Sequence, residues 1–442
     1  MIKKFLVFAL LLSTSQLSFG QRFSLFEAQS YAIENANKYK KEALEVDIAQ
    51  KQIVETRAMG LPQISSDMNF QHFLSLPVQV IDGAFFGQPG ELVDFRAGTD
   101  YTSSAGLTVN QLIFDGSYIV GLQVSKFYKS FAAENLKKTR QDIIYDVTRA
   151  YELALVSQKN LYFLDTLVQS SKDLLENQKA LYETGMITQE DVDQINYSLL
   201  QAETNKSAAE YAYKNAITML KMTMGYDISS PIELTDGLDK IMEDVTSLKE
   251  SSGDIQANLD LNLLKQRKEL REYELRNTQM ANLPRLSAFF NHQYNYFSNE
   301  FDVFDTSNEW FYQTAVGLRL TIPIFSSGER WAKTQQAKIK IKQNEYAIKE
   351  LEQALQMQEI QYRNDYQEAL GKLQLQEKNI ELAKNIYNNA TVRAEIGKES
   401  SISVTQKYNQ LVAAQSQYVG AMVDLFTAKL NLDQLYNKLN NK

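Results

Sequence analysis

The sequence predicts a mixed fold of long α-helices and membrane-spanning β-strands, arranged as a tandem repeat of roughly 215 residues. Three observations support this prediction. The stretch from Leu122 to Thr184 contains neither glycine nor proline and would form a helix about 95 Å long. A similar stretch, from about Gly328 to Ile396, is interrupted only by Gly371. Each stretch follows two runs in which apolar and polar residues alternate, as they do in half-buried strands.

The chain begins with an expected secretory signal over residues 1–20. A charged start precedes the apolar run from Phe5 to Leu12, and the small residues Ser18 and Gly20 stand before the expected cleavage point. The apolar run is too short to cross a bilayer, which takes about 20 residues. We therefore exclude this segment from the fold.

The composition excludes several classes of protein. The chain has no cysteine, so we expect no disulfide, no thiolate metal site and no lipoprotein anchor. Its formal net charge of −8 argues against a nucleic-acid partner. No later run is apolar enough for a transmembrane helix, so a membrane-inserted form would have to be a β-barrel.

We expect the first repeat to contain a helix, two strands around an outer loop, a long helical hairpin and a linker. These parts cover residues 21–61, 62–115 with the loop at 74–100, 116–224 and 225–257. Ser24 and Glu27 form a capping box at the start of the first helix. Gly185 marks the point at which the hairpin reverses, because glycine readily adopts positive φ.

The second repeat follows the same order. Its helix, its strands with their outer loop and its hairpin cover residues 258–282, 283–325 with the loop at 298–308, and 326–442. Leu283-Pro284 repeats Leu61-Pro62 at the start of a strand, and Gly397 repeats Gly185 at a reversal. The first long helix has a seam of positions at alternating spacings of four and three, as packed helices require, in which only Ser157 and Ser171 are not apolar. The apolar members are Ile143, Val147, Ala150, Ala154, Leu161, Leu164, Val168 and Leu175.

The four strands have one apolar face each. A single short alternating run is most often an ordinary half-buried strand, and the repetition is what favours a membrane. The smallest transmembrane barrels have about eight strands, so four strands cannot close one and the chain must oligomerise. Three chains would supply twelve strands and a ring of helices with an open lumen.

The order and duplication of these features resemble the TolC-like outer-membrane factor family. The features are the first helix (Phe23 to Ala28), the paired Leu-Pro strand starts, the paired glycines at the reversals, and the helices after them (Asp191 to Ala202 and Val404 to Gln415). The resemblance implies a homotrimer in the outer membrane of a Gram-negative bacterium. It would have a twelve-stranded outer-membrane β-barrel continued by a long periplasmic α-helical barrel, closed at rest.

The function implied by the resemblance is the exit duct of a tripartite efflux system. Such a duct is a gated, passive channel for small toxic molecules, joined to an inner-membrane pump by a periplasmic adaptor (a membrane fusion protein). One alternative is the outer-membrane component of a type I system that secretes proteins or peptides. A different class is a periplasmic coiled-coil adaptor or structural protein outside the membrane, but this class gives no reason for four strands with apolar faces.

The resemblance also assigns gate residues near the reversals. The acid six residues past the first glycine is Asp191. Two positions that are acidic in many members are Ser403 and Gln406 here, and the position of an expected basic residue is Glu399. The familiar acidic ring and cross-hairpin salt bridge are therefore not expected in full.

The reversals carry apolar residues where a solvated turn would be polar. We assign adaptor docking to five residues there: Gly185, Met186, Ile187, Gly397 and Ile402. Packing across the turn explains the same residues equally well.

Aromatic residues near the outer ends of the strands predict an interfacial belt. Its members are His72, His292, Tyr294, Tyr296, Trp310 and Tyr312. The two histidines lack the acidic neighbours that a metal site would need. No catalytic set, phosphate-binding loop or metal motif is visible, so we expect neither an enzyme nor a cofactor.

Overall fold

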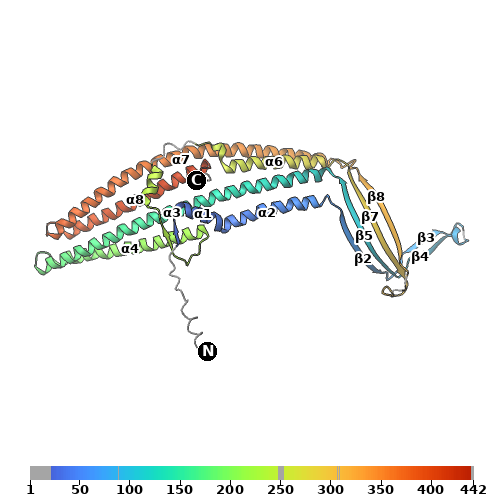
Figure 1. Ribbon diagram of the computed structural model, residues 1–442, viewed down its shortest axis with the longest axis horizontal. Helices are drawn as coiled ribbons and strands as arrows, with labels where there is room; N and C mark the ends of the chain where they lie inside the picture. The colour runs from blue at the N-terminus through green and yellow to red at the C-terminus, as the bar shows by residue number, and fades with distance from the viewer. Residues whose placement is uncertain (1–20, 88, 247–252, 306, 308, 440–442) are drawn as a thin grey trace, which may run out of the picture. The chain divides into compact units, whose positions relative to one another are not determined.

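The computed structural model describes residues 21–87, 89–246, 253–305, 307 and 309–439 (Figure 1). The signal segment expected over residues 1–20 lies outside the described residues. The chain divides into two units, which we describe separately. The tip unit comprises Met1–Val46, Phe131–Lys265 and Tyr346–Lys442, and the sheet unit comprises Asp47–Ser130 and Gln266–Glu345.

Helices dominate the tip unit. Some of them continue into the sheet unit: α2 (Asn37–Ala58), α3 (Gly116–Glu183), α6 (Leu259–Met280) and α7 (Glu329–Glu395). The other elements of the tip unit are β1 (Gln21–Phe23), α1 (Leu25–Asn35), α4 (Gln189–Met224), β6 (Ile232–Leu234), α5 (Leu238–Thr246), a 3-10 turn η2 (Ile255–Ala257) and α8 (Ser401–Leu435). None of the described helices has both the length and the apolar character needed to cross a lipid bilayer.

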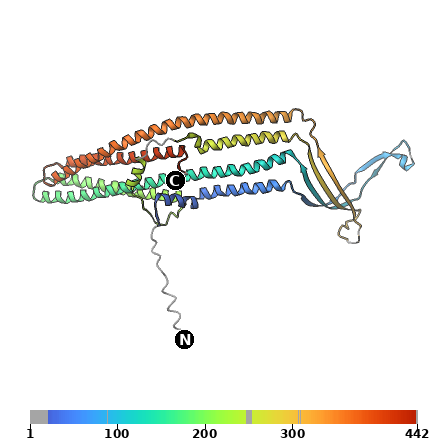
Figure 2. The same cartoon turned by 45° about the horizontal axis from the view of Figure 1, so that its top comes forward.

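The reversals join the long helices into two hairpins, α3 with α4 and α7 with α8 (Figures 1 and 2). One buried cluster packs all four helices together next to the reversals, with Leu164, Ile195, Tyr387 and Leu411 among its members. A second cluster packs α1 and α5 against α3 and α8. The apolar seam of α3 supplies both clusters, because residues spaced by four and three share one helix face.

The sheet unit contains one four-stranded antiparallel sheet of order β2-β5-β7-β8. Its strands are β2 (Gln63–His72), β5 (Tyr101–Phe114), β7 (Arg285–Ser298) and β8 (Phe311–Thr321). Residues paired across the strands lie on the same face. Met68 therefore shares a face with Ala105, Tyr294 and Tyr312. The four apolar strand faces predicted from the sequence join into one continuous face.

Two elements in the N-terminal half differ from the sequence prediction. The first helix is not continuous, because Ala36 is extended (φ −61°, ψ 126°) and separates α1 from α2. The flanking Asn35 and Asn37 are poor helix formers, and the Nδ2 group of Asn35 donates to the Tyr31 carbonyl at 3.1 Å. The outer loop at 74–100 contains a hairpin, β3 (Val78–Asp82) paired with β4 (Leu92–Arg96), and between them a 3-10 turn, η1 (Gly83–Phe86).

The last strand also ends earlier than the sequence prediction of Phe325. β8 stops at Thr321, two residues before Pro323. Proline has no backbone N–H for the ladder, so it terminates a strand. Ile324 and Phe325 lie beyond the sheet and are 90% and 85% exposed.

Candidate functional site at the helix reversals

Both helical hairpins reverse through the same glycine motif. Gly185 has φ 75° and Gly397 has φ 67°, which a side chain would disfavour. After α3, Met186 N–H donates to the Leu181 carbonyl at 3.0 Å, and after α7, Lys398 N–H donates to the Arg393 carbonyl at 2.8 Å. These six-to-one bonds define Schellman motifs, so the repeat extends to the hydrogen bonds of the turns.

Asp191 connects the two hairpins. One of its carboxylate oxygens accepts the Thr188 hydroxyl at 2.7 Å and completes a capping box at the start of α4. The other accepts the Ser401 hydroxyl of α8 at 2.6 Å. These hydrogen bonds, the one from Ser401 first, hold the pKa of Asp191 below its usual range. Asp191 therefore carries a negative charge at neutral pH. Its carboxylate links the start of α4 to the start of α8.

A ladder of uncharged polar contacts continues the connection along the hairpins. The hydroxyls of Ser198 and Thr405 lie 2.8 Å apart between α4 and α8, and both side chains are buried. Farther along, Asn205 Nδ2 donates to the Tyr408 hydroxyl at 3.3 Å. Between α3 and α7, Gln178 Nε2 donates to the Ala394 carbonyl at 2.8 Å.

Glu399 stands at the gate position where the family resemblance implies a basic residue. It forms its contacts within the second hairpin. It accepts the Ser403 hydroxyl and lies 3.7 Å from Lys407 Nζ and 3.9 Å from Arg393 Nη1. The Ser403 hydrogen bond and then the two cations keep the pKa of Glu399 low. Ser400 caps α8, since its Oγ accepts the Ser403 N–H at 3.2 Å.

The remaining predicted tip residues fall into two groups. Ile187 packs against the buried cluster of the four helices. Met186 and Ile402 are 71% and 56% exposed, and Gln406 is also exposed. Packing across the turn thus accounts for Ile187, whereas Met186 and Ile402 are exposed and could contact a partner protein.

Ser401 and Thr405 were absent from the sequence prediction. They continue the seam of α8, in which Ser401, Thr405, Tyr408 and Gln415 lie at spacings of four, three and seven. Residues of a seam face the neighbouring helix, so polar residues within it are candidates for contacts between helices. This pattern could have identified Ser401 and Thr405.

The predicted belt residues lie on the sheet unit, where each has an aromatic ring contact. His72 stacks on Tyr101 with ring centroids 4.3 Å apart, and His292 Nδ1 lies 2.7 Å from Thr314 Oγ1. Tyr294 and Tyr312 are 43% and 72% exposed.

Tyr296 differs from the other belt residues, being only 5% exposed. Its hydroxyl donates to Asp302 of the outer loop at 2.6 Å, and its ring stacks on Trp310. The chain's own outer loop therefore covers this side chain.

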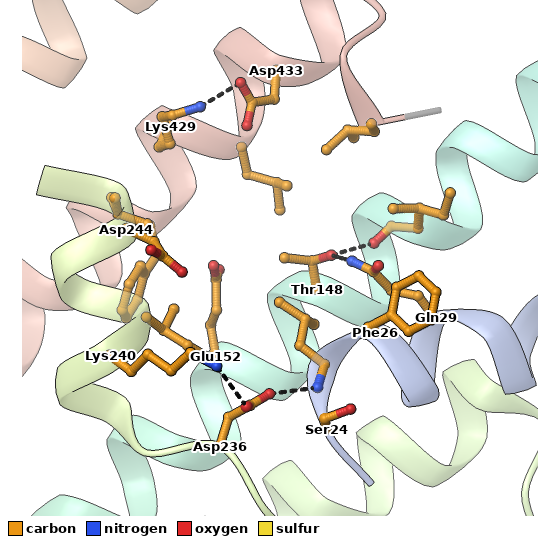
Figure 3. A pocket seen from close by; sticks show the side chains of 17 residues that line it. Ser24, Phe26, Gln29, Thr148, Glu152, Asp236, Lys240, Asp244, Lys429 and Asp433 are labelled. Carbon is orange, nitrogen blue, oxygen red and sulfur yellow. Dashed lines mark hydrogen bonds and ion pairs between the residues drawn. The ribbon is translucent and has the colours of Figure 1, made fainter. Parts of the chain in front are cut away.

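A pocket of about 580 Å³ in the tip unit lies among α1, α3, α5 and α8 (Figure 3). Asp236 accepts the backbone N–H of Leu25 at 2.7 Å, and Gln29 donates to Thr148 at 2.8 Å. Lys429 forms a buried ion pair with Asp433. The hydrogen bonds of Leu25 and Gln29 attach α1 to the rest of the unit, whereas the ion pair lies within α8. Across the described residues, no group of three or more His, Cys, Asp and Glu side chains could hold a metal ion.

Comparisons with known proteins agree with this architecture. The family described as "Outer membrane efflux protein" matches residues 29–226 and 254–438. The outer membrane protein TolC of Vibrio cholerae is 22% identical over 342 residues, covering 77% of this chain and 77% of TolC. The proteases secretion protein PrtF of Dickeya chrysanthemi is 22% identical over 356 residues, covering 78% of this chain and 73% of PrtF.

Solved structures share the fold at low sequence identity. CusC superposes with a TM-score of 0.70 at 14% identity, covering 93% of this chain and 91% of CusC. The outer membrane channel CmeC of Campylobacter jejuni gives 0.68 at 16% identity, covering 93% and 85%. Because the family match spans both repeats, the chain belongs to the outer membrane efflux protein family of TolC-like factors and serves as a non-enzymatic efflux duct of the Gram-negative outer membrane.

Proposed function

We propose that three copies of this chain close a twelve-stranded outer-membrane β-barrel, continued by a periplasmic α-helical barrel. The observation that carries the proposal is the open sheet β2-β5-β7-β8. Its apolar face is exposed to solvent in a single chain, with Met68 85% and Val316 81% exposed. Among the described residues, β2 and β8 each pair on one side only, and such edges pair readily with another chain.

In the proposed barrel, each segment of the chain has a defined location. Extracellular loops lie at 74–100 and 298–308, and residues 62–115 and 283–325 supply the strands between them and the helices. The α-helical barrel is formed by residues 21–61, 116–224, 258–282 and 326–442. The linker around it is formed by residues 225–257. His72, His292, Tyr294, Tyr296, Trp310 and Tyr312 would lie near headgroup level, with Tyr296 of β7 covered by the outer loop.

The reversals then form the periplasmic gate and the docking surface. The gate residues are Asp191, Ser403, Gln406 and Glu399, and the bond from Ser401 to Asp191 supports a resting state in which the hairpins are tied together. The docking residues are Gly185, Met186, Ile187, Gly397 and Ile402, of which Met186 and Ile402 offer exposed apolar surface to the coiled-coil hairpin of a periplasmic adaptor.

The proposed cargo is small toxic molecules, delivered by an inner-membrane pump through the adaptor. Movement through the duct is passive, because the pump supplies the energy. A type I secretion duct is the second candidate, and it is favoured by the names of two relatives, PrtF and the alkaline protease secretion protein AprF of Pseudomonas aeruginosa.

Reconstitution into planar lipid bilayers tests the duct, and gene deletion tests the cargo. We expect discrete conductance steps that are small at rest. A purified protein that inserts but never conducts would contradict the duct. Loss of the gene should sensitise cells to small toxic molecules, whereas a normal resistance profile with a missing secreted protein would favour the second candidate.

A further inference from the structure

The charged residues of the sheet are confined to its polar face. Apart from the two histidines, the four strands contain three titratable charges: Asp67, Arg285 and Arg319. Arg319 pairs with Ser287, and Arg285 pairs with Thr321 in the next row. The two arginines are therefore diagonal neighbours, with backbones about 7–8 Å apart.

Both arginines line one pocket of about 490 Å³. The other polar side chains around it carry no charge: Gln63, Asn110, Gln111, Ser287 and Thr321. The Nε2 groups of Gln63 and Gln111 already donate to backbone carbonyls. The amide of Asn110 and the hydroxyls of Ser287 and Thr321 can donate hydrogen bonds to an oxyanion, and guanidinium groups bind carboxylate and phosphate through two parallel bonds. The two arginines and these three side chains are therefore the donors that the pocket offers to an oxyanion.

A local packing motif holds Arg319 in place. Its guanidinium lies 5.5 Å from the centroid of the Phe289 ring, in the geometry of a cation–π contact. Phe289 in turn pairs with Gly317, where an added Cβ would come within 2.7 Å of the ring. The glycine therefore gives the ring its position, and the ring supports the guanidinium.

Arg285 has an acidic partner, and Arg319 does not. Arg285 Nε lies 3.4 Å from Asp115, whose other carboxylate oxygen accepts the Ser117 N–H at the start of α3. Within the described ranges, no carboxylate lies within ion-pair distance of Arg319. Two cations against one carboxylate leave one positive charge in excess at the pocket.

Only the second repeat carries this arrangement. The positions that correspond to Arg285 and Arg319 in the first repeat are Gln63 and Thr108, and the position of Phe289 is Asp67. The basic pair is therefore a feature of the β7–β8 hairpin and not a requirement of the repeated strand fold. It also contrasts with the net charge of −8 of the whole chain.

We propose that Arg285 and Arg319 form an oxyanion site that binds the carboxylate or phosphate groups of anionic cargo in transit. The proposal rests on the proposed function in one respect, because the polar face of the sheet must line the duct. In the trimer the site occurs three times around the lumen. Anions then gather at this level of the duct, since a cleft lined by one sign of charge concentrates its counter-ion.

Titration calorimetry of the detergent-solubilised protein tests the site directly, with citrate and inorganic pyrophosphate as probes. We expect the wild-type protein to bind both at low ionic strength. The double variant Arg285→Gln/Arg319→Gln should bind them at least about tenfold more weakly, because it loses charged hydrogen bonds. Arg319→Lys keeps the charge without the planar fork and should fall between the two.

Arg96→Gln is the matched control, since it removes the same charge from β4, outside the pocket. Equal binding by the wild type and the double variant, binding by neither, or an equal loss in Arg96→Gln would overturn the site. Far-ultraviolet circular dichroism establishes that each variant is folded.

Bilayer measurements separate the site from the duct. If the wild type conducts, the ratio of anion to cation permeability should fall about threefold or more in the double variant at low salt. An unchanged ratio contradicts the site while the duct stands. A wild type that never conducts contradicts the duct, and the calorimetry still decides whether the two arginines bind oxyanions.

Discussion

At the residue scale, Asp191 makes two sets of contacts that the sequence could suggest only in part. The family resemblance assigned it to the gate by its position after Gly185, and in the structure it completes a capping box with Thr188. Its second partner, Ser401, lies 210 positions away and required the fold to be identified. The resemblance supplied the residue, whereas its partner depends on tertiary packing.

We predict that Asp191→Ala increases ion leak through the resting duct. The substitution removes the α4 capping box and the acceptor of Ser401, so the closed arrangement should lose about 1–2 kcal/mol per chain. Ser401→Ala should raise the leak as well, because it breaks the same bond between hairpins without changing a charge. Asp193→Ala, in the same turn of α4, is the control for charge. Unchanged conductance in both Asp191→Ala and Ser401→Ala would contradict the assignment.

The same bond should make the closed state sensitive to acid. Because the folded-state pKa of Asp191 is lowered, its contribution is complete above the ordinary aspartate value, about 3.9, and is lost as the pH falls through the folded-state pKa. The difference in leak between the wild type and Asp191→Ala should therefore persist from pH 8 to about pH 5 and vanish in stronger acid. A difference that grows on acidification would contradict this sign.

The buried Lys429–Asp433 pair gives a prediction about stability. Both side chains are at most 6% exposed, so Lys429→Ala leaves a buried carboxylate without this cation and should cost about 3–5 kcal/mol. The double variant Lys429→Met/Asp433→Leu should recover most of the loss. Lys333→Ala removes the exposed pair with Glu329 and should cost less than about 1 kcal/mol. Thermal unfolding measures all three, and equal losses at the two sites would refute the burial argument.

At the element scale, the long helices were predictable because their signal is repeated many times. Most turns of the α3 seam from Ile143 to Leu175 contribute an apolar residue to one face, and the absence of proline leaves nothing to end the helix before the reversal. The break at Ala36 and the β3–β4 hairpin were missed. The break depends on a single extended residue, and the hairpin has strands of only five residues. Segments this short do not show a recognisable periodic pattern of apolar residues.

Glycine substitutions in the hairpins should have opposite effects in different places. Gly185→Ala and Gly397→Ala place a side chain at positive φ and should each destabilise by about 1–2 kcal/mol. Neither added Cβ meets an atom within 4 Å, so the cost lies in the backbone. Gly371→Ala, inside α7 and equally uncrowded, should stabilise by about 0.5–1 kcal/mol. Thermal unfolding gives the sign, and a common sign for the three variants would contradict the argument.

At the scale of the whole molecule, the need for further copies of the chain follows from the edge strands β2 and β8 and the apolar sheet face that a single chain leaves exposed. Strand count alone predicted oligomerisation, and the structure adds the register that joins four separate apolar faces into one. The oxyanion pocket could not be predicted in the same way. It depends on the pairing of Ser287 with Arg319, and a shift of one residue in register would move Arg319 to the apolar face.

Closure of the barrel can be tested with cysteine cross-links, since the native chain has no cysteine. If β8 of one chain pairs with β2 of the next, Ala315→Cys combined in turn with Ser65→Cys, Asp67→Cys or Asn69→Cys should give covalent trimers in at least one pairing. Ser104→Cys/Asn295→Cys is the control, because these residues pair within one chain and should leave the mass unchanged. Oxidised samples without any covalent oligomer would contradict the closure.

The most direct test of the trimeric duct is electron cryomicroscopy of the signal-free protein in detergent, with end-on and side views. We predict a three-fold, hollow particle about 130–140 Å long, from a helix of about 100 Å and a strand layer of about 40 Å. A solid rod without a lumen, stable in the absence of detergent, would contradict the duct and leave a coiled-coil protein in its place.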